Sequence, residues 1–279
     1  MFLIQLKNEL WKLFGKKRTY VGFGAFVLVQ TVMLFMFKYT HWQEHARRLL
    51  AGNGYMASEY MSALTVAVIM LLPQIGFLMP LYVALVGGDL VAKEAEDGTL
   101  RMILSRPISR LRLLQVKWLA GIMFAAVLVL ALGVIALSFA RLYFPWKGMF
   151  VFGENGATFA VFPPGEGMER YAFSHLFMVM NAITLLSVSF MFSCFNMKPA
   201  TATILALSYL FMNLVLEHIP FFQPYQGWFI THHFESWLWV FQTPTPWAQI
   251  FESETTLLAA SATAFIVGAA IFQARDIKS

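Results

Sequence analysis

Charged residues are scarce in this chain. Asp, Glu, Lys and Arg make up 13% of its 279 residues, whereas a soluble domain carries about 25%. Hydrophobic residues make up 59%, and so much apolar surface needs lipid as its solvent. The net charge of +5 does not indicate nucleic-acid binding, because most basic residues flank hydrophobic stretches. The composition therefore predicts a polytopic membrane protein rather than a soluble domain.

Cysteine is nearly absent, and so is any phosphate-binding signature. The single cysteine, Cys194, excludes a disulfide within the chain. The pattern G-x-x-x-x-G-K-[ST] does not occur, so this chain cannot build that type of nucleotide-binding loop. No small-residue cleavage site follows the first apolar stretch, which we interpret as an uncleaved span. Any nucleotide hydrolysis must then come from a partner.

Six apolar segments approach the length of about 20 residues that a helix needs to cross a bilayer. Their backbone groups must be satisfied internally, so each should be helical. Pro73 and Pro80 predict a kink in the second span. We expect an all-α polytopic membrane protein with a single transmembrane domain and spans at about residues 19–37, 63–88, 116–142, 173–195, 200–219 and 255–273.

The placement of Lys and Arg predicts the orientation of these spans. Basic residues gather before the first span and between the second and third, whereas residues 220–254 contain none. The positive-inside rule then places both termini in the cytoplasm and residues 143–172 and 220–254 outside. Lys38, Arg47 and Arg48 disagree with this orientation, but the basic run 16–18 abuts the first span and should dominate.

Three segments outside the spans have patterns of their own. Residues 1–15 are amphipathic at helical spacing, which predicts a helix lying in the cytoplasmic membrane interface. Residues 148–165 contain two aromatic and β-branched runs around Asn155-Gly156, a hairpin signal. Residues 221–247 are rich in Trp, Phe, Pro and His and predict a short interfacial helix. The two outer segments are expected to cap the molecule, with or without a specific ligand.

The densest charge cluster lies between the second and third spans. Acidic residues precede Gly98-Thr99, and Thr99 can cap a short helix whose positive end suits those acids. Pro107 should end this helix, and Ser109 can cap the third span. Leu100, Ile103 and Leu104 are expected to be exposed or half-exposed on it. A helix that combines such leucines with acids could dock into a groove of a cytoplasmic protein or fold against its own bundle.

The order of features from Glu94 to Lys117 resembles the permease subunits of ABC-2-type transporters. Acids, Gly-Thr-Leu, apolar residues, Arg-Pro-Ile-Ser-Arg and a lysine at the head of a span follow one another. The layout is similar to that of the nitrous-oxide-reductase maturation permease. The resemblance implies a coupling helix at 94–107 that contacts an ATPase through Glu94, Asp97, Gly98, Thr99, Leu100, Arg101, Ile103, Leu104, Arg106, Pro107, Ser109 and Arg110, with Glu96 in the charged rim.

The same resemblance implies the partners of the chain. Two ATP-binding cassette subunits would bind ATP and Mg, while this chain would hold no cofactor and catalyse nothing by itself. A second permease copy or homologue would complete the membrane unit in a bacterial inner membrane, and an extracytoplasmic protein could be a further partner. The expected function is substrate export or the transmission of mechanical work across the membrane.

An alternative reading is an intramembrane metalloenzyme. His41, Glu44 and His45 match the H-x-x-E-H pattern of inverted zinc proteases. His232 and His233 are weaker candidates for a metal, because adjacent residues on a helix point apart. No soluble catalytic domain surrounds either pair, and a polar helix extension past the first span would explain the first pattern equally well.

Overall fold

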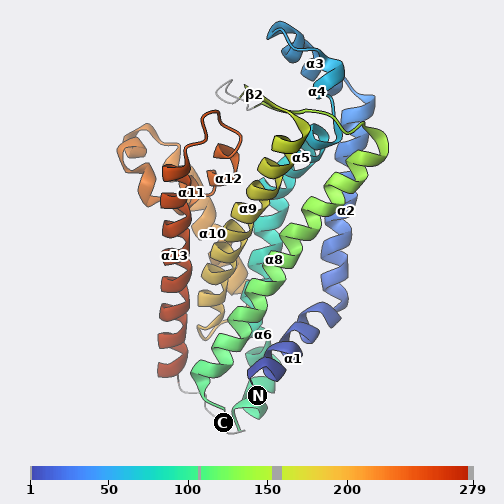
Figure 1. The fold of residues 1–279 in the computed structure, drawn as a ribbon. Helices are drawn as coiled ribbons and strands as arrows, with labels where there is room; N and C mark the ends of the chain where they lie inside the picture. The colour runs from blue at the N-terminus through green and yellow to red at the C-terminus, as the bar shows by residue number, and fades with distance from the viewer. Residues whose placement is uncertain (1, 106–107, 153–158, 276–279) are drawn as a thin grey trace.

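A computed structural model describes residues 2–105, 108–152 and 159–275 of the chain. Six helical segments are long and apolar enough to cross a membrane, so the protein is an all-α polytopic membrane protein, as its composition predicts. They lie side by side in one bundle (Figure 1). The segments are α2 (Lys17–Tyr39), α5 to α6 (Ala63–Glu96), α8 (Arg110–Tyr143), α9 (Pro164–Ser193), α10 (Pro199–Glu217) and α13 (Trp247–Ala274).

The second span departs from a regular α-helix where its prolines predicted. Helix α5 (Ala63–Pro73) passes into the π-helical turn η1 (Gln74–Leu78) and then into α6 (Met79–Glu96). Pro73 cannot donate a backbone hydrogen bond, and a widened turn accommodates its ring. The buried Gln30 side-chain amide of α2 donates to the carbonyl oxygen of Leu132 in α8 at 3.0 Å and approaches Gln74 Oε1 at 3.5 Å. The irregular turn is thereby tied to two neighbouring spans.

Helix α9 forms the centre of the bundle. It packs against α6, α8, α10 and α13, and its inward residues are largely buried. Contact with α6 is close: a Cβ added to Gly87 would lie 2.8 Å from the carbonyl oxygen of Leu186. The hydroxyl of Ser189 donates to the Ala84 carbonyl across the same contact. Small residues thus let these two helices approach each other, as in other membrane bundles.

One end of the bundle, here called the hairpin end, carries α3 (Trp42–Gly52), α4 (Ala57–Tyr60) and a two-stranded sheet (Figure 1). Strands β1 (Met149–Phe152) and β2 (Phe159–Phe162) pair antiparallel, with Met149 opposite Phe162. This confirms the predicted hairpin, although its Asn155-Gly156 turn lies outside the described residues. The backbone amide of Phe150 donates to Thr65 Oγ1 at 2.8 Å, which fixes the sheet on α5.

Residues 220–247 differ from the single interfacial helix that the sequence predicts. They form three short helical pieces, η2 (Pro220–Trp228), α11 (Ile230–His233) and α12 (Ser236–Trp239). Pro224 cannot donate to a regular α-helix, and η2 is accordingly a 3-10 helix. Helix α13 begins at Trp247, eight residues before the predicted apolar span.

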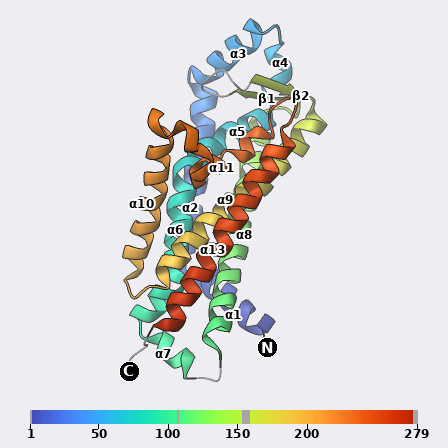
Figure 2. The same ribbon diagram turned by 90° about the vertical axis from the view of Figure 1, so that its left-hand side faces the viewer.

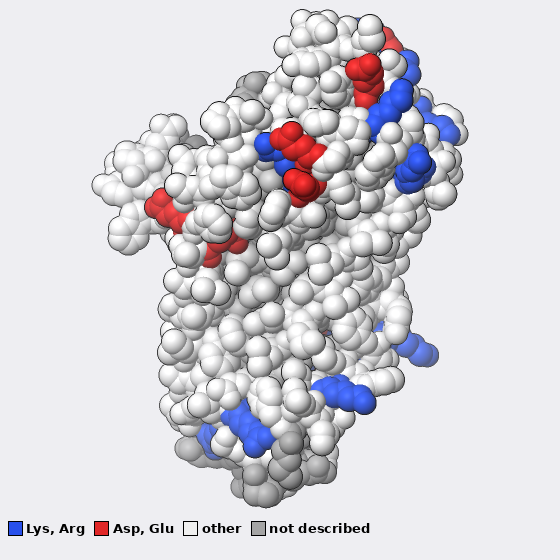
Figure 3. All heavy atoms as spheres, viewed as in Figure 1, with Lys and Arg blue, Asp and Glu red and all other residues white. Residues whose placement is uncertain are grey.

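The opposite end of the bundle, here called the terminal end, holds the first and the last residues that the structure describes, Phe2 and Arg275 (Figure 1). Helix α1 (Phe2–Gly15) leads into α2 there, and α7 (Thr99–Leu104) follows α6 beyond the bundle, as Figure 2 shows. On the face shown in Figure 3, charged side chains gather toward the two ends, and a broad uncharged band lies between them. Such a band is what a membrane-spanning bundle presents to lipid.

Candidate functional site

The short helix α7 owes its position to a glycine rather than to the predicted threonine cap. Gly98 precedes α7 in the left-handed conformation, with φ 72°, which a residue without a Cβ adopts readily. Thr99 does not cap the helix. Its hydroxyl instead donates to the carbonyl oxygen of Glu94 at 3.3 Å. The expectation of a Thr99 cap was therefore wrong, and Gly98 is the residue that turns the chain from α6 into α7.

The apolar residues of α7 do not all face outward. Leu100 is 2% exposed and packs into the core of its own bundle, so its expected exposure was wrong. Ile103 and Leu104 are half-buried against that core. Met102 is 65% exposed, which makes it the apolar residue that α7 presents to solvent. The exposure of Met102 could not be predicted from the sequence, because the period of so short a helix does not reveal which side faces the bundle.

The residues after α7 connect it to α8 and α13. Arg106 and Pro107 lie outside the described residues. Ser109 caps α8, as predicted, by accepting the backbone amide of Arg112 at 3.3 Å. Arg110 donates to the carbonyl oxygens of Gln273 and Arg275 at 3.1 and 2.8 Å. Arg110 thus fastens the start of α8 to the end of α13.

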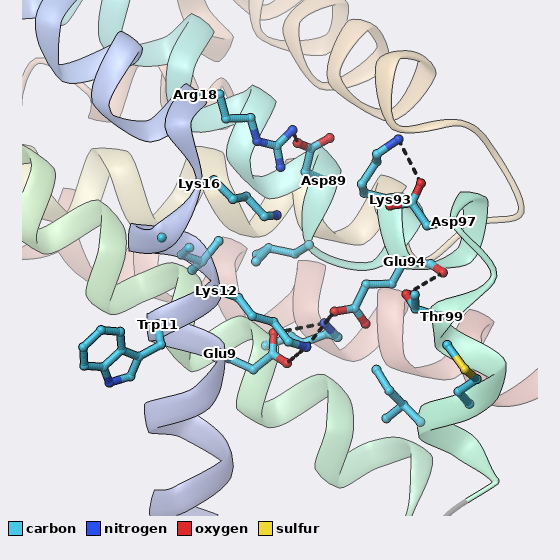
Figure 4. Close-up of a pocket in the computed structure, with 16 residues that line it drawn as sticks. Glu9, Trp11, Lys12, Lys16, Arg18, Asp89, Lys93, Glu94, Asp97 and Thr99 are labelled. Carbon is cyan, nitrogen blue, oxygen red and sulfur yellow. Dashed lines mark hydrogen bonds and ion pairs between the residues drawn. The ribbon is translucent and has the colours of Figure 1, made fainter.

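A buried ion network lies next to α7, between α7 and the body of the bundle. The ammonium group of Lys117 in α8 is 2.7 Å from a carboxylate oxygen of Glu94 and 3.1 Å from one of Glu9. Lys12 approaches the same carboxylates, at 2.7 Å from Glu9 and 3.2 Å from Glu94. These four residues, here called the Lys117 network, join α1, α6 and α8. Figure 4 labels three of them, Glu9, Lys12 and Glu94.

The Lys117 network is balanced in charge, which its burial requires. Lys117 is 1% exposed, and burying an isolated ammonium at such a site costs several kcal/mol of hydration free energy. Breaking a buried ion pair by removing one partner costs about 3–5 kcal/mol. Burial raises the pKa of Glu9, but the charges of Lys117 and Lys12 outweigh it and hold that pKa below its usual value. Burial lowers the pKa of Lys12, and Glu9 and Glu94 raise it above its usual value.

Two further sets of ion pairs surround this network. Arg18, near the start of α2, pairs with Asp89 of α6. Lys93 contacts Glu96 at 2.8 Å and Asp97 at 3.1 Å on the outer side of α6. The Lys117 network, Arg18, Asp89, Lys93 and Asp97 line a cavity of about 890 Å3 between α1, the start of α2, α6, α7 and α8, here called the terminal cavity (Figure 4).

The network changes the interpretation of two acidic residues. Glu94 was expected on the rim of a partner interface, but its carboxylate faces the terminal cavity and pairs with lysines of its own chain. Glu9 belongs to the amphipathic N-terminal helix, and it is buried although it is acidic. The sequence did contain a signal for this network, because Lys117 lies inside the apolar run of the third span. A lysine buried there must pair with a carboxylate.

The hairpin end contains a second polar cluster. Glu217 at the end of α10 accepts from the Thr231 hydroxyl at 2.6 Å and lies 3.2 Å from Nδ1 of His232. His233 instead contacts Ser253 Oγ at 2.9 Å and the carbonyl oxygen of Gly227 at 3.0 Å. The two adjacent histidines therefore serve different partners.

The structure gives no support to the metalloenzyme alternative. His41 immediately precedes α3, and Glu44 and His45 are exposed on that helix. Within the described ranges, no group of three or more His, Cys, Asp or Glu side chains comes together to hold a metal ion. His232 and His233 are likewise engaged in the hydrogen bonds above.

These observations define a class: a six-span membrane protein with a short helix projecting from one end and, beside it, a buried ion network that joins α1, α6 and α8. Comparison with protein families matches residues 6–277 to ABC-2 family transporter protein, and the chain belongs to that family. No curated protein matches the sequence significantly. The family and the fold indicate a multi-pass membrane subunit of a transporter rather than an enzyme, and permeases of this family typically work with ATP-binding subunits.

Proposed function

We propose that this chain is the permease subunit of an ABC transporter and that α7 receives mechanical work from a separate ATP-binding subunit. The position of α7 is the main support for this proposal. Helix α7 lies in the chain between the two longest helical segments and projects beyond the bundle (Figure 2). Met102 is 65% exposed there, and the neighbouring Arg101 and Ser105 are exposed as well. An apolar residue within a polar surround is the arrangement that protein interfaces use as an anchor.

Displacement of α7 would reach the spans by two routes. Gly98 joins α7 directly to α6, and Leu100 packs in the core, so α7 is held against the bundle. The Lys117 network then links the end of α6 to α8 and α1 through Glu94. Movement of α7 would therefore carry α6, α8 and α1 together, because separating them would leave buried charges unpaired.

The remaining parts of the proposed assembly follow the family pattern. Two ATP-binding subunits, each binding ATP and Mg, would engage two permease chains, so that a second copy or a homologue completes the membrane unit. The terminal end would face the cytoplasm of a bacterium, with the chain in its inner membrane. The abundance of Lys and Arg there supports this orientation. The work would drive substrate export or be passed to a protein outside the membrane.

Site-specific cross-linking tests the proposed contact. The only natural cysteine, Cys194, is buried, so a cysteine introduced by Met102→Cys provides one accessible thiol. Met56→Cys is the matched control, because Met56 is 70% exposed and lies at the hairpin end. With the co-expressed ATP-binding subunit in membranes, Met102→Cys should give a thiol cross-link to that subunit, and Met56→Cys should give none. Equal cross-linking from both positions, or from neither, would overturn the proposal.

A further inference from the structure

The Lys117 network joins only some of the spans. It connects α1, α6 and α8, whereas α10 and α13 contribute no residue to it. Those two spans are connected at the hairpin end by residues 218–246, here called the outer segment. A movement that α7 delivers to α6 and α8 therefore needs a further contact to reach the spans that hold the outer segment.

Two arginines at the terminal end provide such a contact. Arg110, the first residue of α8, donates through Nη1 to the carbonyl oxygens of Gln273 and Arg275 at 3.1 and 2.8 Å. The side chain of Arg275 donates in turn to the carbonyl oxygen of Phe195 at 3.2 Å and to Oδ1 of Asn196. These two side chains, here called the arginine clasp, connect the start of α8, the end of α13 and the turn between α9 and α10. Figure 1 shows the ends of α8 and α13 next to each other.

The chemistry of the clasp suits the helix ends at which it acts. The last four carbonyl groups of a helix have no partner within that helix, and they carry a partial negative charge. Arg110 brings donors and a positive charge to this end of α13, and Arg275 does the same just beyond the end of α9. Hydrogen bonds from a charged donor are stronger than neutral ones. Because most of these acceptors are backbone carbonyls, the clasp fixes the positions of the helices themselves.

The clasp lies close to α7 along the chain. Helix α7 ends at Leu104, and α8 begins at Arg110 itself. A displacement of α7 therefore reaches the clasp before it reaches Lys117, which lies two turns further along α8. The clasp is thus the first contact between the moving segment and another span.

The other side of the clasp leads to α10 as well as α13. The end of α9 packs closely on α13, since a Cβ added to Gly268 would lie 3.1 Å from Cα of Met191 and 3.4 Å from Sγ of Cys194. Helix α9 ends at Ser193 and α10 begins at Pro199, so the connection between them is short. A shift at the end of α13 would therefore be passed to the start of α10.

Apolar packing offers a competing route between these spans. Helix α9 packs against α6, α8, α10 and α13, and α13 touches α8 much less extensively than it touches α9. Packed helices can slide past one another by small shear movements. Directional hydrogen bonds between Arg110 and the end of α13 resist such sliding, so α8 holds α13 most firmly at the clasp.

We propose that the arginine clasp transmits the movement of α7 and the start of α8 to α13 and α10, and through them to the outer segment. This inference rests on the proposed function of α7 as the element that an ATP-binding subunit displaces. Arg110 and Arg275 are positioning residues in this scheme, because each holds the end of a helix in place. The Lys117 network moves α1, α6 and α8 together, and the clasp extends that movement to the spans that the network does not reach.

Hydrogen exchange on the complex with the co-expressed ATP-binding subunit, measured with and without ATP, tests the clasp. In the wild-type complex, ATP should change the exchange rates of α6 and of the outer segment. In Arg110→Gln, the change at α6 should persist, and the ratio of rates with and without ATP in the outer segment should fall about fivefold, the lower end of a typical coupling between sites.

Three further variants make the test specific. Arg275→Gln should reproduce the loss of response in the outer segment, and Arg110→Lys should restore part of it, because an ammonium can still donate to the end of α13. Arg112→Gln is the matched control. Arg112 lies in the same turn of α8 but donates to Gln5 of α1 at 3.1 Å, so its loss should leave the outer segment responsive.

The outcomes that contradict the clasp are distinct from those that contradict the proposed function. A wild-type response of the outer segment in Arg110→Gln and Arg275→Gln would show that apolar packing transmits the movement. An equal loss in Arg112→Gln, or a loss that includes α6, would remove the special role of the clasp. Absence of the Met102→Cys cross-link would instead overturn the proposed function, and this inference with it. If size-exclusion profiles show that Arg110→Gln misfolds, Arg275→Gln decides the test.

Discussion

The two ends of the bundle are held together by different chemistry. At the terminal end, acidic and basic side chains from α1, α6 and α8 meet in the Lys117 network. At the hairpin end, aromatic contacts, backbone carbonyls and neutral polar groups hold the outer segments on the spans. The stability of the terminal end therefore depends on a few buried charges, whereas many weaker contacts together stabilise the hairpin end.

Two charged side chains at the hairpin end depart from this contrast: the buried Glu217, which contacts Thr231 and His232, and Arg170. Arg170 extends from α9 to Glu166 at 2.8 Å, to the Gln242 carbonyl at 3.1 Å and to Thr245 Oγ1 at 2.9 Å. Its guanidinium lies 4.2 Å from the centre of the Phe162 ring in β2. A single arginine thus joins the hairpin to the segment before α13. Most of its hydrogen bonds go to backbone or neutral groups, so no second charge is left buried if one bond is lost.

Among the substitutions that test this difference between the two ends, Lys117→Met should lower the stability of the fold most. This change leaves Glu9 and Glu94 sharing Lys12 alone, and breaking a buried pair costs about 3 kcal/mol. The thermal midpoint in detergent should fall, and amide exchange should rise in α1 first. Lys147→Met, at an exposed lysine whose ammonium donates to the Ser58 carbonyl, is the control and should change neither. Equal midpoints for the two variants would mean that the network contributes little.

Arg170→Met should have a smaller effect, confined to the hairpin end. Loss of hydrogen bonds from a charged group costs about 2 kcal/mol, and the segment 240–245 and strand β2 should exchange faster while α1 stays protected. Hydrogen exchange measured peptide by peptide checks this. Arg141→Met provides the comparison, because exposed Arg141 makes one long contact, 3.5 Å, to the Phe144 carbonyl. Exchange that rises throughout the bundle would contradict a local role.

The two ends should also respond to acid in opposite directions. The folded-state pKa of Glu9 is lowered, so its stabilisation is present above its usual pKa of 4.5 and is lost as pH falls through the lower folded value. Burial, and then the charge of Glu217, raise the pKa of Glu235. The free-energy cost of burying the ionised Glu235 carboxylate is therefore relieved as pH falls through that raised value toward 4.5.

Hydrogen exchange, corrected for intrinsic rates, measures both responses. Between pH 7 and 4.5 the segment around Glu235 should become more protected, and below pH 4.5 α1 should become less protected. Glu9→Gln should remove the second response without altering the first. If protection from exchange changed in the same direction at both ends, the proposed difference between the ends would be wrong.

Much of the fold could be predicted because it follows from local signals. Apolar length identified the spans, Pro73 identified the irregular turn, and alternating aromatic runs identified the hairpin. The Ser109 cap was predicted correctly because capping involves residues only three positions apart in the sequence. Such features need no knowledge of the neighbouring helices.

The candidate site was predicted less completely because it depends on contacts distant in sequence. Glu9 and Lys117 are 108 positions apart, and the two chain segments meet only through packing of α1 on α8. Leu100 and Met102 differ in exposure because the bundle covers one side of α7. The left-handed Gly98, and not Thr99, sets the direction of that helix. Sequence spacing could place the helix but not orient it.

The most direct test of the central claim is the capture of the ATP-binding subunit by Met102→Asp. A carboxylate at this exposed tip should leave the fold unchanged but remove an apolar anchor worth about 2 kcal/mol, lowering capture roughly thirtyfold and abolishing ATP hydrolysis coupled to the permease. Met56→Asp, at a similarly exposed methionine of the hairpin end, should be indistinguishable from wild type. Equal capture and equal coupled hydrolysis for Met102→Asp and Met56→Asp would contradict the assignment of α7 as the coupling element.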